Sequence, residues 1–363
     1  MKIGIIMHPY GEKKPGGLPR IIFGWARALL NVDTKNEYLI YFKDAITAPP
    51  DLPGSHWSTH ALGRGRFWLN RLKHAPQADV YLFNTPVLPL FWKPKKAVII
   101  ALDYPYKYLK AESLKQWLFR FFISWYHGYS LRRADHIISV SDSTKRDTMK
   151  FFGVPESKIT TVYHGFTDVC KIPEVRVSIP EKFFFFAGTI KERKNVHRII
   201  EGFAHFLAQH PEAVHKIVIG GINRGRYYER VLASIKEKNL GEKVVFLGHL
   251  SEGQMSFVYK RAEALVFPSI VEGTGFPILE AMSCGAPAIT SNIFGPAELG
   301  ANGGGVLVDP YSSQAIGEAM GRVAFDAVFR EEQVRRGYEQ AKRFNWENTG
   351  RETLAILERI ARS

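Results

Sequence analysis

The hydrophobic pattern of the chain alternates between short apolar runs and longer segments with helical spacing. KIGIIMH at 2–8, DVYLFN at 79–84 and AVIIAL at 97–102 have the length of buried strands. Between them, LPRIIFGWARALLNV at 18–32 repeats its apolar residues every three to four positions, as a helix on a core does. Strands that alternate with helices predict a parallel sheet covered on both faces.

The alternation stops at 163–182, a proline-containing stretch with little periodicity, and then begins again. KFFFFA at 182–187, KIVIGG at 216–221 and ALVFPS at 264–269 are strand-like runs of this second series. The last stretch, 351–363, has the pattern of an amphipathic helix. We therefore interpret 163–182 as a linker with a domain boundary near Ile179.

The predicted fold class is α/β, with two tandem Rossmann-like, doubly wound domains that face each other across a cleft. The expected domains are 1–178 and 179–345, and a helix at 346–363 is expected to pack back on the first domain. Ligands of such sheets bind outside the carboxyl ends of the strands. The cleft is therefore where we expect the site.

Among the features of the composition, the net charge says most about the class of partner that the protein binds. The 363 residues are 45% hydrophobic and 23% charged, which is ordinary for a globular protein, but the net charge is +14. This charge favours an anionic partner, namely phosphorylated metabolites, nucleic acid or an anionic membrane surface; a basic surface that only aids solubility is the alternative.

The expected cellular location follows from two kinds of segment that the sequence lacks. No apolar stretch reaches the roughly 18 residues of a spanning helix, and the N-terminal run is too short for a signal peptide. Cys170 and Cys284 predict neither a metal site nor a disulfide framework, so we expect a reducing compartment. The expected location is cytoplasmic, with peripheral contact to the cytoplasmic face of a membrane as an extension of that expectation.

The stretch VEGTGFPILEAMSCGAP, at 271–287, follows the predicted strand ALVFPS. Pro277 suits the first helical position, and Gly285 suits a helix stop. The free N–H groups of the helix start can bind a phosphate or a sugar hydroxyl, and Glu280 in the first turn is expected to reach such a hydroxyl. In the alternative interpretation, Glu280 only complements the helix dipole and Glu272 is a solvated loop acid.

This stretch resembles the E-x7-E signature of glycosyltransferase family 4, retaining nucleotide-sugar enzymes with the two-domain GT-B architecture. The resemblance implies that Glu272 contacts the donor sugar and Glu280 the nucleotide ribose. It assigns 1–178 to the acceptor and 179–345 to the nucleotide sugar. The glycine loop between the acids is implied in donor binding as well: Gly273, Thr274, Gly275, Phe276 and Pro277. Thr274 and Phe276 depart from the residues common in the family.

The segment GTIKERKNVHRIIEGF, at 188–203, looks like the opening of the second domain in that family. The resemblance implies that Arg193 and Lys194, with Asn195 beside them, bind the donor diphosphate. Cations are needed there because the leaving diphosphate gains charge as the glycosidic bond breaks. Thr189 stands where some members carry a further arginine.

Three weaker matches complete the expected site. Gly16 and Gly17 resemble the first glycine loop of the family, which lies beside the diphosphate. His249 and Leu250 lie where the family places the nucleotide base. Asp103 matches the aspartate of a His-Asp pair whose histidine is replaced by Leu102. Asp103 either orients the acceptor or is an ordinary acid at a strand end.

The predicted function is metal-independent transfer of a hexose with retention, from a nucleotide-diphosphate sugar to a saccharide or lipid-linked saccharide. The sugar nucleotide is a co-substrate, and neither a cofactor nor a metal is expected. Resemblance to bacterial mannosyltransferases of O-antigen pathways makes GDP-mannose the first donor to consider. The alternatives are an epimerase or phosphorylase of related fold, and a non-catalytic basic protein that binds nucleic acid or membranes. No nucleic-acid-binding signature is present.

The acceptor side of the sequence contains basic residues among aromatic ones, at 93–96 and 106–133. This mixture suits contact with anionic lipid headgroups. The alternative is that the aromatic residues belong to the core of a helix. The residues concerned are Trp117, Phe121, Phe122 and Trp125.

Overall fold

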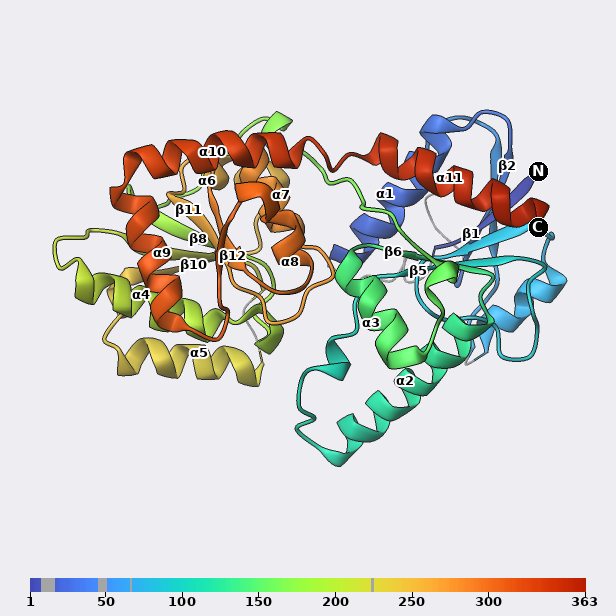
Figure 1. Ribbon diagram of the computed structural model, residues 1–363, viewed down its shortest axis with the longest axis horizontal. Coiled ribbons are helices and arrows are strands. Elements are labelled where there is room, and N and C mark those ends of the chain that lie inside the picture. Colours follow the sequence, from blue (N-terminus) through green and yellow to red (C-terminus); the bar gives the residue numbers. More distant parts are fainter. Residues whose placement is uncertain (8–16, 45–50, 66, 223–224) are drawn as a thin grey trace. The chain divides into compact units, whose positions relative to one another are not determined.

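The computed structural model describes residues 1–7, 17–44, 51–65, 67–222 and 225–363 (Figure 1). These residues form two compact units. The first comprises Met1–Gly165 together with Asn345–Ser363, and the second comprises Phe166–Phe344. Each unit contains one parallel sheet with helices packed against it, which is the predicted α/β class.

The first unit contains a seven-stranded parallel sheet with the order β3-β2-β1-β4-β5-β6-β7. The strands are β1 (Lys2–Ile6), β2 (Glu37–Phe42), β3 (Trp57–Ala61), β4 (Val80–Phe83), β5 (Ala97–Ala101), β6 (His136–Ser139) and β7 (Ile159–Thr161). One face carries a core with Ile3, Ile5 and Trp25. The other carries a core with Tyr81 and Leu131. The central strands are therefore buried on both sides, as their continuous apolar runs predict.

The described helices of the first unit are α1 (Gly17–Val32), α2 (Leu114–Arg133), α3 (Asp142–Phe152) and α11 (Trp346–Arg362), with short 3-10 turns η1 (Trp68–His74), η2 (Pro105–Lys107) and η3 (Glu156–Lys158). Ser113 and Ser141 cap the N-termini of α2 and α3 by accepting hydrogen bonds from backbone N–H groups. Gly153 ends α3 with a φ of 63°, a conformation that costs glycine little.

The second unit contains a six-stranded parallel sheet with the order β10-β9-β8-β11-β12-β13. Its strands are β8 (Phe183–Ala187), β9 (Lys216–Gly220), β10 (Val244–Gly248), β11 (Ala264–Phe267), β12 (Ala288–Ser291) and β13 (Val306–Val308). The four consecutive phenylalanines of β8 are all fully buried, because this strand lies inside the sheet with side chains packed on both faces.

The helices of the second unit are α4 (Val196–Gln209), α5 (Arg226–Glu237), α6 (Glu252–Tyr259), α7 (Phe276–Ser283), α8 (Phe294–Leu299), α9 (Ser313–Phe325) and α10 (Ala327–Ala341), and its 3-10 turns are η4 (Val169–Lys171), η5 (Glu192–Lys194), η6 (Gly241–Lys243) and η7 (Ala301–Gly303). Among the described residues of this unit, strands that are consecutive in sequence and neighbours in the sheet are joined through helices, as parallel pairing requires.

The last helix, α11, packs against α1, at the opposite end of the sequence. The buried indole of Trp25 donates a hydrogen bond to Thr353 Oγ1 at 2.8 Å. Trp346 stacks on His164 and meets Trp25 edge-on. Glycines allow this close approach, because a Cβ atom at Gly350 would lie 2.5 Å from the backbone oxygen of Ala28. The C-terminal helix is thus part of the first unit.

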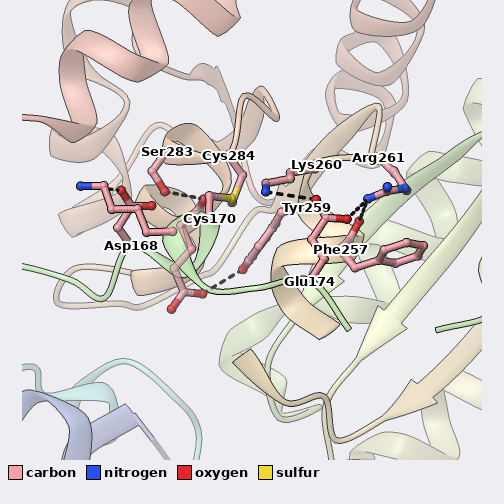
Figure 2. Close-up of a disulfide and its surroundings, with 11 residues drawn as sticks. Asp168, Cys170, Glu174, Phe257, Tyr259, Lys260, Arg261, Ser283 and Cys284 are labelled. Carbon is pink, nitrogen blue, oxygen red and sulfur yellow. Dashed lines mark hydrogen bonds and ion pairs between the residues drawn. A yellow bond between two sulfur atoms is a disulfide. The ribbon is translucent and has the colours of Figure 1, made fainter. Parts of the chain in front are cut away.

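The segment that follows β7 joins the second unit earlier than the expected boundary near Ile179. The second unit begins at Phe166, and η4 contacts α6 and α7. Glu174 pairs with Lys260 at 3.1 Å and with Arg261 at 2.7 Å (Figure 2). These contacts hold the first part of the linker on the surface of the second unit.

Cys170 and Cys284 form a disulfide between η4 and the end of α7 (Figure 2). This corrects our expectation that the two cysteines form no disulfide. They are 114 positions apart, so no local spacing pattern could signal the bond. Among the described residues, no helix is both long enough and apolar enough to cross a membrane.

We predict that Gly350→Ala destabilises the packing of α11 on α1. Alanine is better than glycine in a helix by about 1 kcal/mol, but overpacking against a backbone costs about 1–3 kcal/mol. We expect the clash with the Ala28 backbone to outweigh the gain in helix propensity. Amide hydrogen exchange in α1 and α11 should therefore become faster. Gly241→Ala is the control, since a Cβ atom there meets nothing within 4 Å. Slower exchange in the Gly350→Ala variant would contradict this account of the packing.

Candidate functional site

The turn after β8 places two cations at the carboxyl edge of the second sheet. The chain turns at Gly188, which has a φ of 140°, and then forms η5, which contains Arg193 and Lys194. Asn195 adopts a left-handed conformation with a φ of 62° and precedes α4. Asparagine tolerates this conformation better than most residues. The backbone of Arg193 accepts a hydrogen bond from Ile270 N at 2.8 Å, which fixes the turn beside the loop after β11.

Glu272, in that loop, binds both cations through one carboxylate oxygen. Arg193 Nη1 lies 2.5 Å from Glu272 Oε2, and Lys194 Nζ binds the same oxygen. The Lys194 ammonium also lies 4.3 Å from the centre of the Phe267 ring. The three side chains are mostly buried, with exposed fractions of 25% for Arg193, 11% for Lys194 and 13% for Glu272. The structure therefore brings together three of the residues predicted from sequence.

The ionisation of Glu272 follows from these neighbours. Burial by itself would raise the pKa of the Glu272 carboxyl. The charges and hydrogen bonds of Lys194 and Arg193 outweigh burial, and the pKa is lowered below its ordinary value. The Glu272 carboxyl is thus charged at neutral pH and lies between two cationic side chains. Arginine and lysine side chains held in this way are donors that are already positioned for an anion.

Asn195 ties the cation turn to the rest of the unit. Its amide nitrogen donates to Pro268 O at 2.9 Å and to Pro310 O at 2.6 Å. Its amide oxygen accepts from Arg198 at 2.9 Å. The residue is completely buried, so its side chain supports the cation turn from within the protein. The contact with the donor that sequence analysis assigned to Asn195 stays a prediction.

The glycine loop after Glu272 leads directly into α7. Gly273, Thr274 and Gly275 are buried, and Gly275 has a φ of 134°, which other residues rarely adopt. The loop lies against α8, since Gly295 N donates to Glu272 O at 3.1 Å. The helix begins at Phe276, so Pro277 is its second residue. The N–H groups at this helix start remain candidates for a ligand contact.

Glu280 lies in the second turn of α7, and this corrects our expectation of the first turn. Its side chain is only 2% exposed. Glu280 Oε2 accepts a hydrogen bond at 3.0 Å from the hydroxyl of Tyr259, at the end of α6. Sequence analysis missed Tyr259, because nothing in the spacing of the two residues links them. The buried tyrosine fixes the position of the acid, and the ribose contact of Glu280 stays a prediction.

A group of glycines at neighbouring strand ends is the second feature that sequence analysis missed. Gly188, Gly221 and Gly248 follow or end β8, β9 and β10, and all three have positive φ. Gly221 N donates to Gly248 O at 2.6 Å, and a Cβ atom at Gly221 would lie 2.0 Å from Gly188 O. The available signal was a glycine at the end of three successive apolar runs. At these three positions the edge of the sheet consists of backbone atoms, because glycine has no side chain.

The other residues of the second unit that are expected to contact the sugar nucleotide lie along this edge. Thr189 is partly buried after β8. His249 is exposed after β10, whereas Leu250 is buried, and its Cδ1 atom lies close to Gly220. All three residues follow strand ends, where ligands of parallel sheets bind. Their contacts with a nucleotide stay predictions.

In the first unit, Asp103 is partly buried and follows β5. Leu102, which replaces the histidine common in the resembled family, packs against the core. Its carbonyl oxygen accepts from Thr144 Oγ1 at 2.8 Å. Gly17 is the first residue of α1, and Gly16 lies outside the described residues. Within the part of the chain that the structure describes, no group of three His, Cys, Asp or Glu residues could hold a metal ion.

Comparison with known families matches two consecutive parts of the chain. Residues 172–342 match the family described as Glycosyl transferases group 1, and residues 34–168 match Glycosyltransferase Family 4. The chain belongs to glycosyltransferase family 4. The match over 172–342 contains Arg193, Lys194, Glu272 and Glu280, so the charged cluster and the E-x7-E motif lie inside the family region.

Among curated proteins, this family 4 chain is similar to O-antigen chain mannosyltransferase B of Escherichia coli. The two are 28% identical over 235 residues, which is 62% of this chain and 61% of the relative. The chain thus matches about three fifths of the length of that relative.

Solved structures confirm the GT-B fold that sequence analysis predicted. Sucrose-phosphate synthase from Thermosynechococcus elongatus superimposes with a TM-score of 0.76 at 20% identity, over 99% of this chain and 98% of the other. HepE of Anabaena, solved in complex with UDP and glucose, gives a TM-score of 0.75 at 17% identity, over 99% of each chain.

We predict that Glu272→Gln destabilises the protein in a pH-dependent way. A lowered pKa in the folded state means that the carboxylate stabilises the fold above its unfolded pKa, and that this stabilisation is lost as pH falls through the folded pKa. Leaving two cations without their acid should cost about 3 kcal/mol at pH 7. Urea unfolding should reveal this loss at pH 7 and a smaller difference from wild type below about pH 4.

Glu174→Gln is the matched control, because Glu174 also pairs with two cations but at the surface of the second unit. Exposed ion pairs contribute little, so this variant should lose much less stability at pH 7. Equal losses of stability in the two variants would mean that the buried cluster around Glu272 stabilises the fold no more than the exposed ion pairs of Glu174 do.

Proposed function

We propose that the chain is a retaining, metal-independent glycosyltransferase that moves a hexose from a nucleotide-diphosphate sugar to a saccharide or lipid-linked saccharide acceptor. The observation that carries this proposal is the cluster in which Arg193 and Lys194 meet Glu272 in the loop after β11. In this proposal the second unit binds the donor and the first unit binds the acceptor, whose hydroxyl is oriented by Asp103.

The proposed reaction breaks the bond between the anomeric carbon of the sugar and an oxygen of the diphosphate. The acceptor oxygen forms the new bond on the same face, and its proton passes to the departing phosphate oxygen. No protein nucleophile is needed. Arg193 and Lys194 offset the charge that develops on the diphosphate, with help from the N–H groups at the start of α7.

The acids have a different role in this proposal. Glu272 holds hydroxyl groups of the donor sugar, and its position depends on the same two cations that bind the diphosphate. Glu280, fixed by Tyr259, holds the ribose. The glycine edge at Gly188, Gly221 and Gly248 lets the nucleotide approach the backbone closely. The cations thus bind the diphosphate in the middle of the sugar nucleotide, and the two acids bind the sugar and the ribose on either side of it.

We propose GDP-mannose as the donor and synthesis of a cell-surface polysaccharide as the setting. The similarity to the O-antigen mannosyltransferase of Escherichia coli supports both statements. UDP-glucose is the competing donor, because a structure with the same fold was solved with UDP and glucose. The base and the sugar are therefore the parts of the proposal to be tested first.

A thermal-shift screen tests the donor. Ligand that binds only the native state stabilises it by RT ln(1 + [L]/Kd), about 2.7 kcal/mol at a hundredfold excess over Kd. We expect GDP-mannose to raise the melting temperature more than UDP-glucose does, and GDP more than GMP. A larger shift with UDP-glucose would reject the mannose donor but keep the transferase. No shift with any sugar nucleotide would contradict the transferase itself.

We predict that Lys194→Ala lowers kcat by about 10²–10³-fold, equivalent to about 2.7–4 kcal/mol, as expected when one donor to a developing negative charge is removed. The assay follows release of the nucleoside diphosphate with the donor found in the screen. Lys191→Ala, an exposed lysine three positions earlier, is the control and should retain normal turnover. Near-normal kcat of Lys194→Ala would refute the role of this residue.

A further inference from the structure

The first twelve residues of α2, 114–125, expose large apolar side chains that a helix normally buries. Their exposed fractions lie between 42% and 73%, and none of them belongs to the described core clusters. They are Leu114, Trp117, Leu118, Phe119, Phe121, Phe122 and Trp125. The interpretation of these aromatic residues as helix core is therefore wrong. An exposed patch of this kind marks a surface that binds something.

The exposed residues gather on one side of the helix. At 100° per residue, six of the seven fall within an arc of about 140°, and Phe119 lies beyond one edge. Trp117 stacks on Phe121 with ring centres 6.0 Å apart. Only the C-terminal half of α2 has buried residues, among them His127, Gly128 and Leu131. The helix is thus anchored at one end, and its other half extends from the unit (Figure 1).

An apolar pocket of about 410 Å³ continues this surface between α2 and η1. Phe122 and Trp125 line it from α2, and Trp68 and Leu69 line it from η1. The hydroxyl of Tyr126 donates to Leu88 O at 2.5 Å and so holds the neighbouring loop in place. The exposed face and the pocket share two side chains and form one continuous apolar region.

The charges around the region favour an anionic partner, because 106–133 contains six lysine or arginine residues and one acid, the exposed Glu112. The segment 114–133 contains no Asp or Glu, and Lys115 and Arg120 lie among the aromatic residues. Lys110 precedes the helix, and Lys93 follows the exposed Phe91, whose ring packs at 5.3 Å from Phe67 near the pocket. With a net charge of +14, a second copy of the chain would be repelled.

We propose that this region docks the chain on the surface of an anionic phospholipid bilayer. The exposed face of α2 lies at the boundary between headgroups and acyl chains, the lysines contact the phosphates, and the pocket takes up a hydrocarbon chain. Aromatic side chains with lysine and arginine beside them are typical of helices that lie in this interface. Docking goes beyond the transfer reaction and does not rest on it.

Vesicle flotation with the full chain tests the proposal. The vesicles are phosphatidylcholine alone or phosphatidylcholine with phosphatidylglycerol. We expect the chain to float with the anionic vesicles at low salt. Lys110→Gln combined with Lys115→Gln should weaken this binding by about fivefold per lysine removed. Absence of the chain from the anionic vesicle fraction at low salt would overturn the proposal.

Aromatic variants identify the surface that binds. Trp117→Ser combined with Phe121→Ser should weaken binding to the anionic vesicles by at least about tenfold. The control is Val214→Ser combined with Val328→Ser, which removes two exposed apolar residues of the second unit and should bind like wild type. Circular dichroism checks that each variant is folded. Undiminished binding by the folded aromatic variant would overturn the assignment to α2.

Insertion has its own signature in tryptophan fluorescence. Vesicles with brominated acyl chains should quench the wild type, and Trp117→Phe combined with Trp125→Phe should lose most of this quenching while it still binds. Sedimentation of the free protein tests the competing occupant. A dimer that dissociates on Trp117→Ser combined with Phe121→Ser would mean that a second copy covers this face, and would overturn the membrane proposal.

Discussion

The candidate site depends on one electrostatic arrangement, in which a buried carboxylate is held between two cations. Removing the acid would leave two buried cations without their carboxylate. The arrangement requires that the turn after β8 and the loop after β11 meet at the same edge of the sheet, and parallel pairing of these neighbouring strands provides this. Asn195 then bonds the turn to the backbone at Pro268, just after β11. Fold and charge cluster are thus mutually dependent.

The same arrangement holds the two cations in place through a group of the protein itself. Glu272 binds both of them, and its lowered pKa keeps it charged at neutral pH. In the proposed function, Arg193 and Lys194 also bind the donor diphosphate. Hydrogen-bond donors that are held in place before a ligand binds need little reorganisation, and this is the condition under which charge stabilisation is most effective.

The sequence predicted features that depend on local pattern. The apolar runs become the strands of two parallel sheets. Arg193 and Lys194 follow β8 and Glu272 follows β11, so they lie at the carboxyl edge of the sheet, as predicted. Features made by distant residues were not predictable. The bond between Tyr259 and Glu280, the disulfide of Cys170 with Cys284, and the glycine contact of Gly221 with Gly188 depend on how elements pack. No spacing rule along the chain encodes these pairs.

The aromatic segment of α2 was ambiguous for a different reason. Its apolar residues have helical spacing, and that pattern is the same whether the apolar face meets a core or a bilayer. Only the exposed fractions, such as 64% for Phe119 and 55% for Trp125, separate the two cases. Surface charge could not decide the matter alone, because phosphorylated sugars and anionic lipids both attract a basic protein.

The most direct test of the central claim is a crystal structure of the chain in complex with its sugar nucleotide. We expect diphosphate oxygens within about 3 Å of Lys194 Nζ and of the Arg193 guanidinium. We also expect Glu272 to contact hydroxyl groups of the sugar and Glu280 to contact the ribose. A diphosphate bound away from both cations, with the two acids directed away from the ligand, would contradict the account.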